Sequence, residues 1–192
     1  MEHKGTVLLE TARLILRPFT EADAGQVFDN WASDAEVTKY LTWPTHQSVE
    51  QSLGYMRYCV KCYEAPDTYQ WGIERREDHA LIGSISVVRI HEDIGEMELG
   101  WVIGRRFWGQ GYTPEAAKRV LDFLFDEVGA NRISAGHDVN NPNSGKVMRK
   151  IGMKYEGTTR QSARNNQGIV DCSHYAVLWS DRETVREARE RT

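Results

Sequence analysis

The chain has 192 residues, of which 40% are hydrophobic and 10% aromatic. This length and apolar content are enough for one well-buried α/β domain. The net charge is −4, with acidic and basic residues interspersed. That pattern argues against nucleic acid as a partner, which would favour a basic stripe.

The sequence also bears on location. No apolar run approaches the roughly 20 residues that a membrane span needs, and no signal-peptide pattern opens the chain. Three cysteines is an odd number for the disulfide scaffold of a secreted protein. We therefore expect a cytoplasmic protein with no membrane partner, either a monomer or a homodimer.

Hydrophobic periodicity predicts four elements before residue 65. They are a strand over 13–18, a helix from Thr20 to about 31, a short helix over 34–41 and a longer helix over 48–64. Thr20 with Asp23, and Ser48 with Gln51, have the spacing of capping boxes. The short and longer helices are separated by a break at Trp43 and the proline that follows it.

The longer helix contains Cys59 and Cys62 in a C-x-x-C pattern, which can serve redox chemistry or zinc binding. No second cysteine pair and no histidine pair stands at ligand spacing in the sequence, and no strand–helix unit precedes the pattern. We interpret both as helix cysteines without chemistry, and we predict no metal site.

Strands are predicted over 69–75, 81–90 and 96–103, joined by connections so short that neighbours must run antiparallel. A helix ending at Gly129 and a fifth strand over 133–139 follow. This strand–helix–strand unit is long enough for a parallel crossover. The fold class is therefore α/β (α+β) with a mixed sheet, antiparallel first and parallel at the candidate ligand site.

A short loop with Gly109 and Gly111 joins the central strand to its helix. Thr113 is the predicted N-cap, with Pro114 in the first helical position. Such a loop points backbone N–H groups at one spot, and the helix dipole adds to them, so an anion site is expected. The alternative is a strand–turn–helix that binds nothing. Neither the P-loop pattern nor the third glycine of a dinucleotide fingerprint is present.

The last part of the chain has one more predicted helix, with Asn141 as N-cap, Pro142 in the first position and Gly152 at its end. Two late strands, over 153–160 and 169–179, enclose a polar loop over 161–168. A charged tail helix is predicted from Ser180 to the end of the chain. Residues 8–179 are expected to form one domain, with residues 180–192 as its tail.

Three strings resemble a known family. RFWGQG, residues 106–111, resembles the R/Q-x-x-G-x-G/A signature of the GNAT superfamily of N-acetyltransferases. ELGWVIGRRFWGQGY and LETARLILRPFTEAD resemble its RimJ/RimL-like branch, which acetylates the N-termini of ribosomal proteins. NPNSGKVMRKIGMKYEG resembles the second signature, N-x-x-S-x-x-x-x-x-K-x-G-F, with Met153 replacing the usual Phe. The resemblance covers residues 8–179.

The resemblance implies a single GNAT-type domain: a mixed, mostly antiparallel sheet with helices on both faces and a parallel pair at the acetyl-CoA site. It also implies that pairing across the crossover is interrupted there, which frees backbone amides of the central strand. Acetyl-CoA is the implied cosubstrate and an amine the implied acceptor. The implied cofactor-binding residues are Trp101, Val102, Ile103, Arg106, Trp108, Gly109, Gln110, Gly111, Tyr112, Thr113, Asn141 and Ser144.

Two residues are candidates for the chemistry. Glu98 shares a strand face with Gly100 and is the candidate base, acting directly or through a water. Its alternative is a solvated edge charge, as it is for Glu96. By resemblance, Asn141 contacts the pantetheine arm and the Ser144 hydroxyl lies near the thioester sulfur, whereas the alternative for Ser144 is an ordinary first-turn helix serine.

The ionisation of amines bears on the choice of acceptor. An α-amine with a pKa near 8 is about a tenth neutral at pH 7, whereas lysine is neutral on the order of 0.04% of the time. A protein or peptide N-terminus is therefore favoured. A small-molecule amine, such as an amino acid, polyamine or antibiotic, is the alternative substrate, and a non-catalytic acyl-CoA-binding module the alternative class. Trp43, His46 and Arg164 are candidates to shape the acceptor pocket.

Overall fold

The structure is a computed structural model that describes residues 1–182. Its centre is an eight-stranded sheet in the order β1-β2-β3-β4-β5-β6-β8-β7. Only β5 and β6 pair in parallel, and the other neighbours are antiparallel. The mixed sheet predicted from the sequence is confirmed. The strands are β1 (Leu9–Glu10), β2 (Leu14–Arg17), β3 (Gln70–Arg75), β4 (Leu81–His91), β5 (Glu96–Ile103), β6 (Arg132–Asp138), β7 (Lys154–Asn165) and β8 (Gly168–Leu178).

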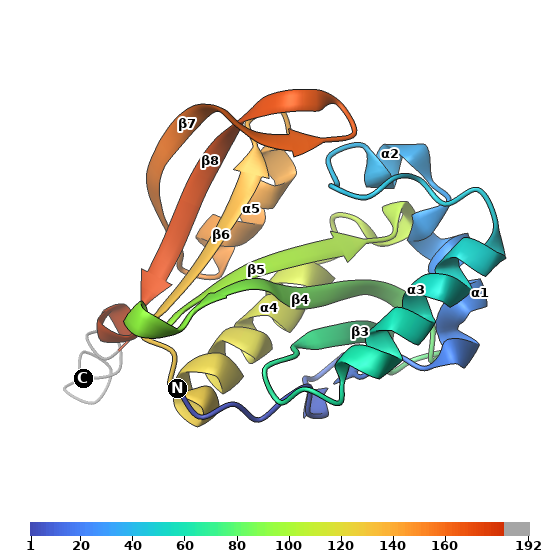
Figure 1. The fold of residues 1–192 in the computed structure, drawn as a ribbon, viewed down its shortest axis with the longest axis horizontal. Coiled ribbons are helices and arrows are strands. Elements are labelled where there is room, and N and C mark those ends of the chain that lie inside the picture. Colours follow the sequence, from blue (N-terminus) through green and yellow to red (C-terminus); the bar gives the residue numbers. More distant parts are fainter. Residues whose placement is uncertain (183–192) are drawn as a thin grey trace.

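Helices cover both faces of the sheet (Figure 1). Apolar residues of α4 and α5 pack with one face of the sheet, and those of α1 and α3 form a second cluster with the other. The α-helices are α1 (Ala24–Val27), α2 (Ala35–Thr38), α3 (Val49–Cys62), α4 (Tyr112–Phe123) and α5 (Pro142–Lys150). Within residues 1–182, every helix is too short or too polar to cross a membrane.

The parallel pair is the feature that makes room for a ligand. β5 and β6 pair only through Glu96, Met97 and Glu98, after which the strands diverge (Figure 1). β5 stays paired with β4 as far as Ile103. The backbone N–H of Gly104 donates to β4, and directions alternate along a strand, so the N–H groups of Trp101 and Ile103 face the gap. The interruption implied by the family resemblance is therefore present.

Several predicted boundaries change. Helix α4 begins at Tyr112, because Gly111 adopts φ +81° and becomes the N-cap in place of Thr113. Gln51 accepts a hydrogen bond from Gln47 N–H, so it does not complete a capping box with Ser48. The Thr20 capping box forms as predicted, and it opens a helical stretch that starts as a 3-10 turn and ends as a π-turn.

The predicted polar loop over 161–168 is mostly strand. Arg164 pairs with Ile169 and Asn165 with Gly168, so β7 and β8 form a long hairpin with Asn166 at its tip. The strand pairing shifts register near Gln161, which has φ +48°. The strand therefore continues through polar residues that the sequence pattern assigned to a loop. The predicted tail helix lies almost wholly outside the described residues.

Candidate active site

A pocket of about 530 Å³ lies where β5 and β6 separate. One wall is the segment 36–41, from α2 and the turn after it, and the other runs from Asn140 into α5. The end of β5 and the loop that opens α4 lie between these two walls. The pocket therefore gathers the two signature stretches that are far apart in the sequence.

The glycine loop presents its backbone to this pocket. Gly109 has φ +75°, and a Cβ placed there would meet nothing within 4 Å, so the space beside it is free for a ligand. Gly109, Gly111, Tyr112 and Thr113 all line the pocket. The N–H groups of the first turn of α4 have no partner within the helix, and the positive end of its dipole lies here. This arrangement can hold a phosphate group.

Arg13 and Glu115 fasten the loop, a role that the sequence did not reveal. Glu115 accepts hydrogen bonds from Thr11 Oγ1 (2.6 Å) and from Arg13 Nε (2.7 Å). Arg13 lies over the Tyr112 ring at 4.5 Å and donates to the Gln110 carbonyl at 3.1 Å. Burial alone would raise the pKa of Glu115, but the hydrogen bonds from Thr11 and Arg13 lower it.

Of three loop side chains predicted to bind the cofactor, only the one at position 108 lines the pocket. Arg106 points away from the pocket, where it donates to Asn30 Oδ1 and lies over the Phe107 ring. Gln110 turns back to donate to the Arg106 carbonyl at 2.9 Å. Trp108 does line the pocket, with 45% of its surface exposed and its Nε1 bonded to the Ile103 carbonyl at 2.8 Å.

The second signature forms the opposite wall. Asn141 and Ser144 both line the pocket, and Asn141 Nδ2 donates to Ser144 Oγ at 3.3 Å. Ser144 is in the first turn of α5, after Pro142, and lines the same pocket as Trp101 and Ile103 of β5. Lys146 and Lys150 also line this wall; Lys150 is the lysine of the second signature, whereas Lys146 was not singled out in the sequence.

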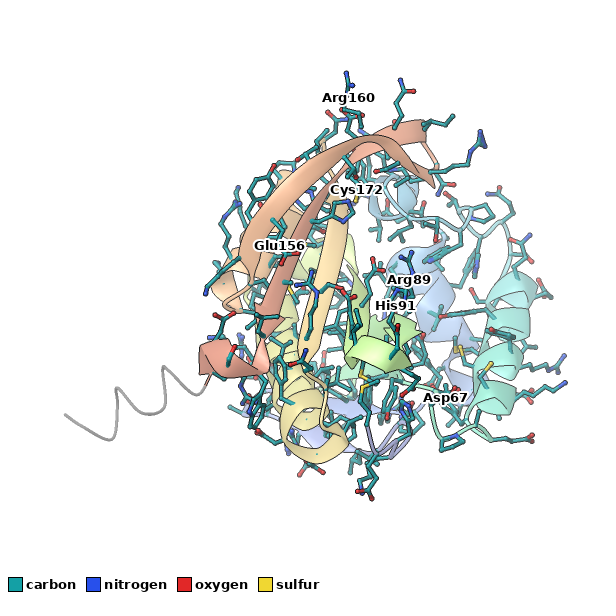
Figure 2. All side chains as sticks on the ribbon, turned by 60° about the vertical axis from the view of Figure 1, so that its left-hand side comes forward. Asp67, Arg89, His91, Glu156, Arg160 and Cys172 are labelled. Carbon is teal, nitrogen blue, oxygen red and sulfur yellow. The ribbon has the colours of Figure 1, made fainter. Side chains whose placement is uncertain are left out.

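Glu98 does not line this pocket and lies on β5 at the last position where β5 and β6 still pair. Its side chain is 25% exposed, and its Oε2 is 3.5 Å from Arg89 Nε. Figure 2 shows Arg89 between the β7–β8 hairpin and the helices α1 and α3. Burial, together with the nearby charge of Glu98, raises the pKa of Cys172. Glu98 and Ser144 are thus on different elements that flank the separation of the strands.

The residues proposed for the acceptor pocket divide into two groups. The rings of Trp43 and His46 contact each other at 5.4 Å, and His46 Nδ1 is bonded to Ser52 Oγ at 2.8 Å. Burial lowers the pKa of His46. Arg164 belongs to the hairpin, next to its tip. Arg105 pairs with Asp34, the N-cap of α2, at 2.9 Å and so holds the 36–41 wall in place.

The C-x-x-C residues lie apart from the pocket, in α3. Cys59 is buried, and burial raises its pKa to about 11, so its thiol stays protonated. Cys59, Cys62 and Cys172 are all free. Across residues 1–182, no group of three His, Cys, Asp or Glu side chains could hold a metal ion.

Comparison with known proteins gives a consistent assignment. Residues 13–154 match the acetyltransferase (GNAT) domain family. YoaA, an uncharacterized N-acetyltransferase of Bacillus subtilis, is 32% identical over 171 residues, which cover 89% of this chain and 96% of YoaA. A GNAT-family acetyltransferase of Bacillus anthracis has a TM-score of 0.78 at 26% identity, covering 90% of this chain and 98% of its own.

A ribosomal-protein-S5-alanine acetyltransferase of Vibrio fischeri has a TM-score of 0.79 at 18% identity, covering 91% of this chain and 98% of its own, so it shares the fold. The match to the family extends over most of the chain and includes the loop, α4 and α5. The chain therefore belongs to the GNAT acetyltransferase family and is an acetyl-CoA-dependent N-acetyltransferase.

Proposed function

We propose that the protein acetylates the N-terminal α-amine of a protein or peptide. The observation that carries the proposal is one pocket that combines a glycine loop at a helix N-terminus, free backbone amides on β5 and the Asn141–Ser144 pair. Each of these suits a different part of an acetyl thioester with a phosphate-bearing tail.

The residues present fit acetyl-CoA. The open space beside Gly109 and the N–H groups at the start of α4 suit its pyrophosphate. The N–H groups of Trp101 and Ile103 can donate to the acetyl and pantetheine carbonyls, and Asn141 to the pantetheine arm. When bound, acetyl-CoA supplies the activated acetyl group.

Proton transfer falls to two side chains. In this proposal the Ser144 hydroxyl donates a proton towards the departing sulfur, and Glu98 accepts one from the amine, directly or through a water. The Oε2 atom of Glu98 lies 3.5 Å from Nε of Arg89, so a guanidinium stands beside this carboxylate. Free amides facing the gap stabilise negative charge that develops on the acetyl oxygen.

The chemistry favours an α-amine as acceptor. A site with only one modest base suits an amine that is already partly neutral. An α-amine is about a tenth neutral at pH 7, whereas lysine is neutral on the order of 0.04% of the time. The structural likeness to a ribosomal-protein-S5-alanine acetyltransferase agrees with this choice. Small-molecule amines remain the second candidate for the substrate.

A screen of CoA release tests the proposal. The acceptors are peptides beginning with Ala, Ser or Met, the same peptides with a blocked N-terminus and one free lysine, linear polyamines, amino acids and aminoglycosides. We expect turnover with free N-termini and little with the blocked peptides. Turnover confined to polyamines or antibiotics would replace the N-terminus by a small molecule. Acetyl-CoA binding without turnover of any amine would indicate a non-catalytic module.

A further inference from the structure

The two halves of the sheet are joined at one end only by the short β5–β6 pairing. That pairing spans Glu96, Met97 and Glu98, and beyond it the strands diverge on either side of the pocket. At the far end the tip of the β7–β8 hairpin reaches towards α2 across this divergence (Figure 1). The contacts at this tip join the two sides of the divergence.

Asn166, at the hairpin tip, bonds to the wall formed around α2. Its Nδ2 donates to the Thr38 carbonyl at 2.9 Å and to the Trp43 carbonyl at 2.8 Å. Its backbone N–H donates to the Leu41 carbonyl at 3.1 Å. All three carbonyls lie in or next to the 36–41 segment that lines the pocket.

The neighbouring residue grips the other half of the sheet. Asn165 Nδ2 donates at 2.8 Å to Oδ2 of Asp138, the buried last residue of β6. The other carboxylate oxygen of Asp138 accepts from the backbone N–H of Asn140 at 2.8 Å, where the α5 wall of the pocket begins. Two adjacent asparagines therefore connect both walls of the pocket.

We infer that Asn165 and Asn166 form a clasp that closes the open end of the divergence and restricts the acceptor to a primary amine on a slender chain. The inference rests on the proposed function and names the shape of acceptor that the same site admits. An extended peptide N-terminus or a linear polyamine passes between the fastened walls. An amine attached directly to a bulky ring system does not. Asn166 is a positioning residue, since it fixes the walls and does not contact the reacting atoms.

The exposure of the clasp makes it suitable for mutation. Asn166 is exposed, and its bond to Trp43 lies at the surface, so its loss removes little of the buried structure. Asn166→Asp keeps the size but cannot donate to the two carbonyls, whereas Asn166→Ala removes the side chain altogether. Gln167→Ala, at the next exposed position, is the matched control.

The experiment compares kcat/KM for an Ala-initiated peptide with that for an aminoglycoside. We expect the wild type to favour the peptide, and Asn166→Ala and Asn166→Asp to shift the ratio at least tenfold towards the aminoglycoside. The Kd for acetyl-CoA should change less than this ratio does, since the glycine loop is fastened separately by Arg13 and Glu115. Gln167→Ala should match the wild type in both measurements.

An unchanged ratio in a folded Asn166 variant, or a wild type that uses both acceptors equally, would overturn the clasp. If the Asn166 variants do not fold, Asn165→Ala breaks the contact with Asp138 and must give the same shift. If the wild type turns over no amine, the proposed function fails. Hydrogen exchange then tests whether Asn166 fastens the 36–41 wall. Asn166→Ala must speed the exchange of amides in 36–41 relative to Gln167→Ala, and equal rates refute it.

Discussion

Replacing Gly145 by alanine should disturb the active site through a single steric contact. A Cβ at this position would lie 2.7 Å from Nε2 of His137, about 0.7 Å short of the 3.4 Å at which ordinary contact begins. The ring cannot swing aside easily, because its Nδ1 donates to the Asp138 carbonyl at 2.7 Å and its other side faces Tyr175. The first turn of α5 must therefore move, and Ser144 moves with it.

The displacement sets the expected magnitude. Overpacking of this kind costs about 1–3 kcal/mol of folding free energy. A misplacement of about 1 Å at a reacting group can lower the rate about 100-fold. We therefore expect Gly145→Ala to lower Tm and to reduce kcat by about 10- to 100-fold. CoA release under saturating acetyl-CoA and thermal unfolding measure the two effects.

Two further variants make the reasoning refutable. His137→Ala in the Gly145→Ala background removes the contact, so the double variant should recover kcat relative to Gly145→Ala alone, measured as a double-mutant cycle. Gly54→Ala is the control, since a Cβ there meets nothing within 4 Å and alanine favours a helix. Wild-type kcat and Tm in Gly145→Ala, or no recovery in the double variant, would show that the contact does not position α5.

Four other outcomes are expected. Gly111→Val, at φ +81°, should weaken acetyl-CoA binding at least about 100-fold by calorimetry, because the backbone is both strained and covered; unchanged affinity would remove the loop from the binding site. Ser144→Ala should lower kcat roughly 10- to 1000-fold and leave the Kd for acetyl-CoA within threefold. In the wild type, kcat/KM should rise with pH through an ionisation of the enzyme, and Glu98→Gln should abolish that rise. A rise whose midpoint instead follows the pKa of the acceptor amine would count against Glu98 as base. Burial alone would raise the pKa of Asp23, but hydrogen bonds led by Arg17 lower it, so this carboxyl stabilises the fold above about pH 4 and the stability is lost as pH falls further; the acid-induced fall in Tm should be shallower in Asp23→Asn.

Local patterns in the sequence predicted most of the fold. The alternation of Met97, Leu99 and Trp101 defines β5, and the helical spacing behind Gly111 defines α4, because both periods follow directly from backbone geometry. The unit that runs from β5 through α4 to β6 was long enough for a parallel crossover, and β5 and β6 do pair in parallel. The boundary at Thr113 was wrong because Gly111 can take a left-handed conformation that the pattern alone does not reveal.

Contacts between distant residues were the part that the sequence could not supply. Arg13 lies 102 residues from Glu115, and nothing in the pattern near either residue marks the pair. The Arg89 partner of Glu98 depends on a register irregularity in β4 between Val87 and Arg89. The family signature indicated Arg106 as part of the site, but its side chain turns to Asn30, a partner that only the folded chain brings near.

The separate fastening of the glycine loop has a consequence for how such proteins diversify. The loop is held by Arg13 and Glu115, whereas the 36–41 wall of the pocket is held by the hairpin tip at Asn166. Substitutions in the second set leave the bonds of the first intact. Variation in these two short stretches is therefore compatible with an unchanged hold on the glycine loop.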